Sequence, residues 1–242
     1  MGAFLTALFT GLRLGSVYAL VALGYTMVYG IIKLINFAHG DFIMVGAYAL
    51  FFTVPVLRAA GAPAWLAVIA AVLVCAAVGM VTELAAYRPV RKTGTNMTAL
   101  ITAIAVSLIL ENLAQAIPAI GPNPRTVASI FAAGGISLAG ATLSWATIIT
   151  IAVSLVIMLI LYSFTQKTRL GRAMRAVSED KQAATLMGIN VNSTILITFA
   201  IGAGLAGVAA PLHVAPFPPA PHAVCPPPGP LPFLAGGSVH PL

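Results

Sequence analysis

Polar side chains inside long apolar stretches are the residues of this sequence that could do chemistry. Glu111 lies near the middle of one such stretch, with Asn112 beside it and Gln115 one helical turn further on. A carboxylate at the centre of a bilayer costs about 2.5–3.5 kcal/mol on insertion scales, so Glu111 must face other helices or a watery path. Two hypotheses stay open: a polar patch on a translocation path, or an interhelical hydrogen bond worth about 0.6 kcal/mol.

A second polar segment, from Asn36 to Asp41, joins two apolar stretches with almost no loop. In one interpretation Asn36 caps the second helix and Asp41 lies in its first turn, where the helix dipole favours an anion. In the other, the segment is a broken helix on a substrate path, because irregular backbone at membrane depth is tolerated only beside protein or water. His39 has no nucleophile or metal-ligand partner, so we expect a structural or gating role for it.

The other reactive residue types form no enzymatic, metal or cofactor pattern. The apolar stretches hold no paired carboxylates, no HExxH and no Ser/His set. Cys75 and Cys225 are isolated, without CxxC spacing. We therefore expect a protein that is not an enzyme, with no catalytic residue, metal or cofactor. Although the net charge is +7, the basic residues lie between apolar stretches and not along one stripe, so nucleic acid is not an expected partner.

An all-α, polytopic transmembrane bundle must position these residues. Of the 242 residues 60% are hydrophobic and 7% charged, against about 25% charged in soluble domains, which excludes a soluble or a disordered chain. About 20 apolar residues cross a bilayer. Such spans must be helices, because lipid offers no partner to a backbone N–H or C=O group. Six stretches qualify: Leu14–Leu34, His39–Leu57, Ala64–Ala86, Met97–Pro118, Thr142–Ser163 and Ser193–Leu212.

The basic residues set the expected orientation. Most of the 12 Lys and Arg residues lie in the connections after the first, third and fifth spans, which must share one side of the membrane: Lys33, Arg88, Arg91, Lys92, Lys167, Arg169, Arg172, Arg175 and Lys181. The other side keeps Arg13, Arg58 and Arg125. The positive-inside rule places the first group in the cytoplasm and the N-terminus outside.

Small residues recur within the spans, from Ala67 to Gly79 and from Gly202 to Gly207. In lipid, small residues let helix backbones approach one another closely. We therefore expect a packed helix bundle and not a set of isolated anchors.

The longest of the basic connections, Thr165–Asn192, predicts a short amphipathic helix. Leu170, Met174 and Val177 recur at the spacing i, i+4 and i+7. The alternative is a solvated basic loop that only satisfies the positive-inside rule.

A second short helix follows in the same loop. Ser178 is expected to cap it, with Glu179 and Asp180 in its first turn at the positive end of the helix dipole. Gly188 is placed to end it in the left-handed conformation. Together the two helices would form a small knob on the cytoplasmic face.

Three stretches resemble the LivH-type permeases of branched-chain amino acid importers. They read GSVYALVALGYTMVYG from Gly15, INFAHGD from Ile35 and GRAMRAVSEDKQAATLMGIN from Gly171, and YRPVR from Tyr87 also fits. The resemblance covers the chain from about residue 11 to residue 210, with matching order and spacing. The string Gln182-Ala-Ala, followed three residues later by Gly188, is similar to the EAA loop of ATP-binding-cassette (ABC) permeases, with Gln in place of the usual Glu.

The resemblance implies a multi-pass permease of the bacterial plasma (inner) membrane that imports branched-chain, apolar amino acids. Its implied partners are a homologous permease subunit in a heterodimer, two cytoplasmic ATPase subunits and an extracytoplasmic substrate-binding protein, with membrane lipid around the spans. ATP hydrolysis is expected on a separate chain, because no GxxxxGK[ST] string is present. The loop would dock on an ATPase through Glu179, Asp180, Gln182, Ala183, Ala184 and Gly188.

The substrate path would then take the polar residues of the spans: Asn36, His39, Glu111, Asn112 and Gln115. Two alternatives stay open. One is import of urea or short amides by the same architecture. The other is an ion-coupled secondary carrier or a channel, for which only Glu111 offers an ion site within the membrane.

The last part of the chain, residues 211–242, has a different composition. Of the 17 prolines most fall in this tail, including the run Pro226-Pro-Pro-Gly-Pro. Each proline inside a helix costs about 3 kcal/mol, so a further spanning helix is excluded there. We expect a disordered Pro-rich segment or an aberrant sequence, produced by a truncation or frame shift of a longer permease after about residue 210.

Overall fold

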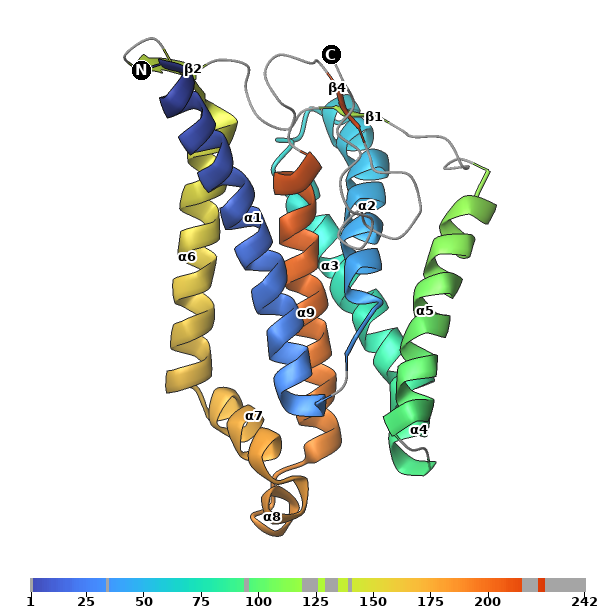
Figure 1. Cartoon of the computed structure of the whole chain (residues 1–242). Coiled ribbons are helices and arrows are strands. Elements are labelled where there is room, and N and C mark those ends of the chain that lie inside the picture. The colour runs from blue at the N-terminus through green and yellow to red at the C-terminus, as the bar shows by residue number, and fades with distance from the viewer. Residues whose placement is uncertain are drawn as a thin grey trace.

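The computed structural model describes residues 2–33, 35–93, 96–118, 126–128, 135–138, 141–214 and 222–224. Helices dominate these residues, so the expected all-α class is confirmed (Figure 1). The helices are α1 (Gly2–Ile32), α2 (His39–Ala59), α3 (Leu66–Thr82), the π-helix η1 (Glu83–Tyr87), α4 (Arg88–Thr93), α5 (Asn96–Ala116), α6 (Trp145–Lys167), α7 (Arg169–Glu179), α8 (Lys181–Leu186) and α9 (Val191–Val214).

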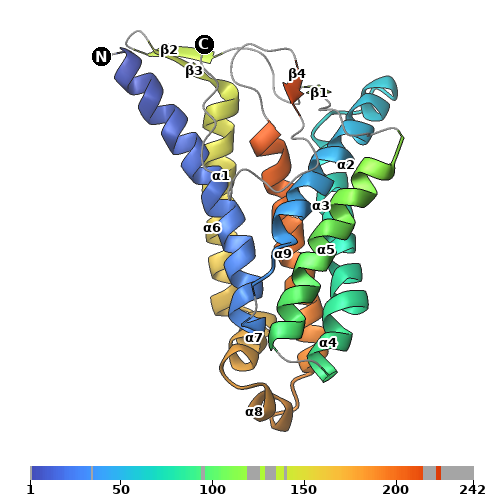
Figure 2. The ribbon, with the colours of Figure 1, turned by 45° about the vertical axis from the view of Figure 1, so that its right-hand side comes forward.

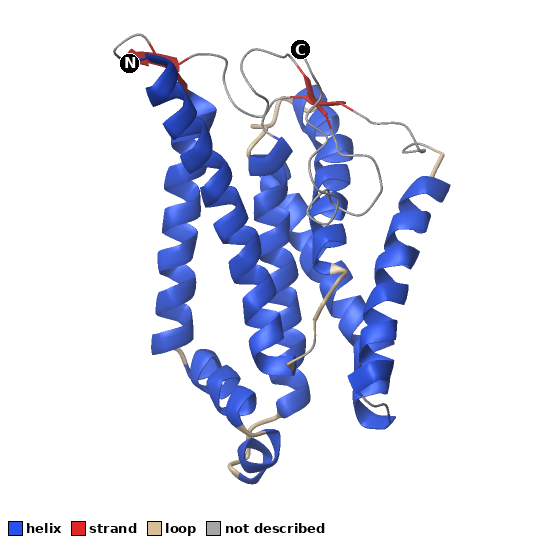
Figure 3. Ribbon diagram, in the orientation of Figure 1, coloured by secondary structure: helices blue, strands red, loops and turns tan. Residues whose placement is uncertain are grey.

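Among the described residues, four short strands form two separate pairs at one end of the bundle (Figure 3). β1 (Thr126–Ala128) pairs antiparallel with β4 (His222–Val224), and β2 (Gly135–Leu138) pairs antiparallel with β3 (Ala141–Ser144). Their length of three or four residues leaves the helical class unchanged.

Six helices of the described residues are long and apolar enough to cross a membrane, so the chain is a multi-pass membrane protein. They are Phe4–Ile32, His39–Ala59, Leu66–Arg91, Met97–Ala116, Trp145–Lys167 and Val191–His213. The first begins well before the expected Leu14, because Arg13 is buried and does not interrupt the helix. The fifth begins after the expected Thr142, because Ser144 caps it and accepts a hydrogen bond from the Ala146 amide at 3.3 Å.

The basic connections gather at one end of the bundle. α4, α7 and α8 lie together at the lower end in Figure 1, where α1 also ends, and the strands lie at the opposite end. In Figure 2 the spanning helices converge toward this end, which we call the basic end. The charge asymmetry expected from the sequence therefore corresponds to one side of the folded chain.

Helix α9 is the centre of the bundle. It packs against α1, α2 and α3 and is more enclosed than the other five spans. Small residues on α9 and on α3 permit this approach. A Cβ added at Gly207 of α9 would lie 2.9 Å from the Ala71 carbonyl oxygen, and one added at Gly79 of α3 would lie 2.5 Å from the Ala203 Cβ. The close packing predicted from the small residues is confirmed.

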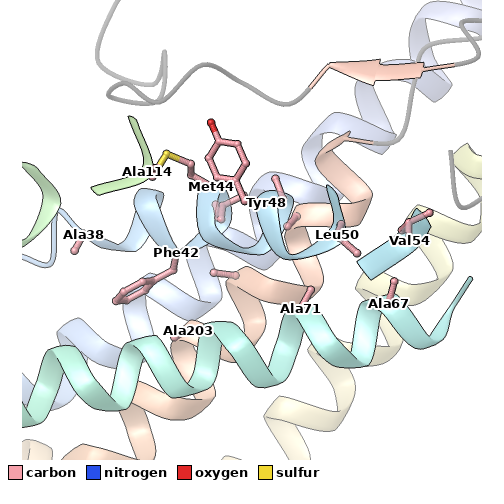
Figure 4. Packing of buried hydrophobic residues seen from close by; sticks show 14 of the residues in the cluster. Ala38, Phe42, Met44, Tyr48, Leu50, Val54, Ala67, Ala71, Ala114 and Ala203 are labelled. Atoms are coloured by element: carbon pink, nitrogen blue, oxygen red, sulfur yellow. The ribbon is translucent and has the colours of Figure 1, made fainter. Parts of the chain in front are cut away.

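The largest apolar cluster fills the space between α2, α3 and α9 (Figure 4). Phe42, Leu50 and Val54 of α2 are almost fully buried there, with Ala71 of α3 and Ala203 of α9. The cluster fixes the start of α2 against the two helices behind it.

We expect Gly207→Ala to lower the melting temperature of the chain in detergent, measured by circular dichroism. The new methyl would meet backbone atoms of Ala71 and Val72, and overpacking costs about 1–3 kcal/mol. Gly204→Ala is the matched control, because it lies on the same helix and its nearest neighbour would be 3.7 Å away. Equal melting temperatures of the two variants would contradict this packing.

The proline-rich tail lies mostly outside the described residues. Helix α9 continues through Pro211 and ends at Val214, and β4 is the other described part of the tail. The predicted disorder or frame shift of residues 211–242 stays a prediction.

Candidate functional site

The helical structure is interrupted between α1 and α2 at membrane depth. Helix α1 ends near the basic end of the bundle, where Lys33 adopts a positive φ of 58°. From there the chain returns as non-helical backbone, and α2 begins only near the middle of the bundle (Figure 1). We call residues 35–38 the break. Irregular backbone at this depth needs partners other than lipid, so its polar groups must be satisfied by protein or by a ligand.

The side chain of Asn36 does not cap α2, so that prediction is wrong. The N-cap position belongs to Ala38, and no side chain bonds the first turn. The Asn36 Oδ1 atom instead accepts a hydrogen bond of 2.7 Å from the Tyr87 hydroxyl of η1. Asn36 is 3% exposed, and its Nδ2 atom has no hydrogen-bond partner among the described residues.

His39, the first residue of α2, is buried between aromatic rings. Its ring centroid lies 6.0 Å from that of Tyr25 and 6.3 Å from that of Phe42. A Cβ added at Gly24 would lie 2.9 Å from the His39 Cε1 atom, so this glycine makes room for the imidazole. Among the residues that the structure describes, no three His, Cys, Asp or Glu side chains gather as metal ligands.

Asp41 in the first turn of α2 joins the break to α5. The Ser107 hydroxyl donates a hydrogen bond of 2.5 Å to the Asp41 Oδ2 atom, although 66 residues separate the two. Asp41 is only 6% exposed. Sequence reasoning treated Asp41 as a charge at a helix end, and nothing in the spacing pointed to Ser107.

The three polar residues expected on α5 are not equivalent. Glu111, one turn after Ser107, is half-buried and interacts electrostatically with Asp41. Asn112 is exposed, and its amide donates to the Leu108 carbonyl of its own helix at 2.7 Å. Gln115 is also exposed. The structure therefore brings Glu111 toward the break and leaves Asn112 and Gln115 on the outer side of α5.

A buried ion pair lies on the π-helix beside the break. The carboxylate of Glu83, which is 1% exposed, accepts a hydrogen bond from Arg91 of α4. π-Helical turns inside an α-helix occur often at functional sites. Sequence reasoning missed the roles of Glu83, Tyr87 and Arg91, although the last two belong to the YRPVR string that carries part of the family resemblance.

The loop at the basic end forms the two expected helices, with a different cap. Asp180, and not Ser178, caps α8, because its Oδ1 atom accepts hydrogen bonds from the Gln182 amide at 2.7 Å and the Ala183 amide at 3.2 Å. Ser178 lies within α7 and donates to the Arg175 carbonyl. The prediction for Ser178 is wrong, since the chain changes direction two residues later, at Asp180.

The other expected features of this loop are present. Met174 and Val177 are buried as predicted, whereas Leu170 is 39% exposed. Gly188 has a φ of +80°, the predicted left-handed conformation at the end of α8. Glu179 is the last residue of α7.

The end of α8 presents an apolar surface that sequence reasoning did not single out. Leu186 is 88% exposed and Met187 is 83% exposed, while Ala184 on the other side of α8 is buried. We call Leu186 and Met187 the apolar tip. Helix α8, at whose end the tip lies, is placed beyond the spanning helices at the basic end (Figure 1).

We expect Asp180→Ala to speed hydrogen exchange of the Gln182 and Ala183 amides. Loss of an N-cap costs about 1 kcal/mol, which is about a fivefold change in local opening. Glu179→Ala is the control, because Glu179 makes no cap to α8. Mass spectrometry of peptides that cover α8 measures both variants, and equal exchange would contradict the capping role of Asp180.

The comparisons with known proteins agree with this architecture. The sequence profile described as "Branched-chain amino acid transport system / permease component" matches residues 7–221. The high-affinity branched-chain amino acid transport system permease protein BraD of Pseudomonas aeruginosa is 41% identical over 222 residues, which cover 86% of this chain and 70% of BraD. No solved structure matches the chain significantly.

Further relatives carry the same kind of name. The high-affinity permease protein LivH of Salmonella typhimurium is 41% identical over 217 residues, 85% of this chain and 69% of LivH. A probable branched-chain amino acid transport permease protein LivH of Methanocaldococcus jannaschii is 29% identical over 197 residues, 78% of this chain and 60% of that protein. With six membrane-spanning helices and a profile match over most of its length, the chain belongs to the branched-chain amino acid transport permease family.

Proposed function

We propose that this chain is the membrane-spanning permease subunit of an ABC importer for branched-chain amino acids. The observation that carries the proposal is the apolar tip, formed by Leu186 and Met187 on a capped helix beyond the membrane spans. A contiguous exposed apolar surface on a short helix is typical of a protein-binding site. The names of the relatives supply the substrate class.

The basic end of the bundle is the cytoplasmic end in this proposal. Lys33, Arg88, Arg91 and the basic residues of the α6–α8 region lie there, and the positive-inside rule puts such an end in the cytoplasm. The N-terminus is then outside, in a bacterial inner membrane. The tip points toward cytoplasmic ATPase subunits, which hydrolyse ATP for transport.

The ATPase-coupling site comprises Glu179, Asp180, Gln182, Ala183, Ala184 and Gly188, together with the apolar tip. Within it, Asp180 and Gly188 set the two ends of α8. Gln182 and Ala183 are exposed to a partner, whereas buried Ala184 packs α8 onto the rest of the loop.

Movement of the loop can reach the break through buried side chains. Ala184 of α8 belongs to the same buried apolar cluster as Tyr87 of η1 and Phe199 of α9. The ring centroids of Tyr87 and Phe199 lie 5.2 Å apart. From η1, the hydrogen bond between Tyr87 and Asn36 leads to the break. A shift of α8 would thus move the backbone at membrane depth.

The substrate path includes Asn36, His39 and Glu111 around the break. Asn112 and Gln115 are exposed on α5, so we assign them to a part of the path that a second, homologous permease subunit completes. The remaining partners are two ATPase subunits and an extracytoplasmic substrate-binding protein.

Uptake of labelled leucine by cells separates this function from an ion-coupled carrier. The host lacks its own branched-chain importer and its ATP synthase, carries this chain with its partner subunits, and makes ATP from glucose. A protonophore then removes the proton gradient and spares ATP, whereas arsenate removes ATP. We expect arsenate to abolish uptake and the protonophore to leave most of it. The reverse pattern would overturn the proposal.

A further inference from the structure

We propose that Asp41 and Asn36 bind the two charged groups of the transported amino acid itself, where α2 begins inside the membrane. In this site the Asp41 carboxylate pairs with the α-ammonium group. The Asn36 amide and the first backbone N–H groups of α2 hold the α-carboxylate. The inference rests on the proposed transport function and gives its substrate class a place on this chain.

The environment of Asp41 favours a cation. Its carboxylate is buried, and among the described residues its partner is the neutral hydroxyl of Ser107. The neighbouring charge is another negative one, from Glu111, and among the described residues no salt bridge joins Asp41 to a basic group. A buried carboxylate without a counter-charge is costly. Arg91 of α4 is already paired with Glu83.

The environment of Asn36 favours an anion. Tyr87 donates to the Asn36 Oδ1 atom and so fixes the amide, while the Nδ2 donor of this 97%-buried residue is left without a partner. A buried unsatisfied donor costs about 1–3 kcal/mol. Asn36 lies three residues before α2, and its carbonyl accepts from the His39 N–H at 3.3 Å. The next N–H groups, of Gly40 and Asp41, lie at the positive end of the helix dipole and are the ones that would hold the carboxylate. Half-helix ends of this kind hold substrate carboxylates in membrane carriers.

Asp41, together with Asn36 and the start of α2, selects a zwitterion. Asp41 reduces the positive field of the α2 end, so a ligand that is only an anion gains less there than one that also brings a positive group for Asp41. An α-amino acid carries both groups on one carbon atom. Ala38 and Val106 are buried beside these polar groups, and Leu110 is partly buried against the same cluster, which suits an apolar side chain.

Ligand binding to the full-length chain in lipid nanodiscs tests the site. The probes are L-leucine, 4-methylpentanoate, which lacks the ammonium group, and 3-methylbutylamine, which lacks the carboxylate, each measured by saturation-transfer NMR. We expect leucine to bind at least tenfold more tightly than either analogue. Asp41→Asn should weaken the binding of leucine at least tenfold, whereas 4-methylpentanoate should bind at least as tightly as to the wild type. Asn36→Ala should weaken the binding of leucine and leave the affinity for 3-methylbutylamine unchanged.

Two further variants separate binding from folding. Ser107→Ala keeps the carboxylate and removes its hydrogen bond, so a loss of a few-fold in leucine affinity is expected. Thr102→Ala removes a hydroxyl that donates to the Thr98 carbonyl of its own helix α5, and this variant should bind like the wild type. Melting temperatures of all variants check that each is folded.

Several results would overturn the assignment. The first is absence of leucine binding to the wild type, and the second is wild-type affinity of Asp41→Asn for leucine. The third is an equal loss of affinity for all three probes in a variant. The fourth is a requirement for sodium, which would make Asp41 part of an ion site. Failure of the transport function is a different result. If uptake by the wild-type transporter depends on ATP while the binding pattern is contradicted, this site alone is wrong.

Discussion

Replacement of both Leu186 and Met187 by glutamate is expected to detach the ATPase subunits from this chain and to abolish uptake. The two side chains are 88% and 83% exposed, so the change leaves the fold of the chain intact. Burial of one large apolar side chain contributes about 1.5–3 kcal/mol. Loss of two such contacts predicts a decrease of at least a hundredfold in the affinity for the ATPase subunits.

Co-purification from detergent and the ATPase rate of the reconstituted complex measure this effect. Arg172→Glu is the matched control, because it places a negative charge on an exposed position of α7, away from the apolar tip. We expect the control to keep its ATPase subunits. Normal stoichiometry of the ATPase subunits with the double variant would contradict the docking role of the tip.

Arg91→Ala is expected to lower the stability of this chain strongly. It leaves the carboxylate of Glu83, which is 1% exposed, without its salt-bridge partner. Breaking a buried ion pair from one side costs about 3–5 kcal/mol. For a chain of this size the melting temperature should fall by roughly 6–20 °C, measured by circular dichroism in detergent.

The double variant Glu83→Gln/Arg91→Ala separates the lost charge pair from lost packing. Removal of the buried charge should restore most of the stability, because the penalty arises from the unpaired carboxylate. Arg88→Ala is the control, since Arg88 takes no part in the ion pair. If Arg91→Ala and Arg88→Ala melt at the same temperature, the ion pair does not stabilise the bundle.

The sequence predicted the spans because hydropathy is a local property. Each stretch of about 20 apolar residues forms a helix in lipid whatever its neighbours are. The positions of the charges along the chain likewise predicted which connections share an end. Gly188 was predicted correctly for the same reason, since only a residue tolerant of positive φ suits the end of α8.

The polar contacts at membrane depth could not be predicted, because they join distant parts of the chain. One interpretation of the sequence had Asn36 capping α2, but the hydroxyl of Tyr87, 51 residues away, donates a hydrogen bond to its side-chain oxygen. Asp41 and Ser107 are 66 residues apart, and their pairing depends on how α5 docks beside α2. Even the local cap of α8 was predicted at the wrong residue, at Ser178 and not at Asp180. Both residue types cap helices, so only the backbone geometry decides between them.

Uptake by purified components tests the central claim most directly. The transporter that contains this chain is reconstituted into proteoliposomes, with ATP on the side of α8 and with labelled leucine and the substrate-binding protein on the other side. We predict accumulation of leucine only when ATP and the binding protein are both present, and none with the glutamate variant of the apolar tip. Accumulation of leucine without ATP, driven by an ion gradient alone, would contradict the account.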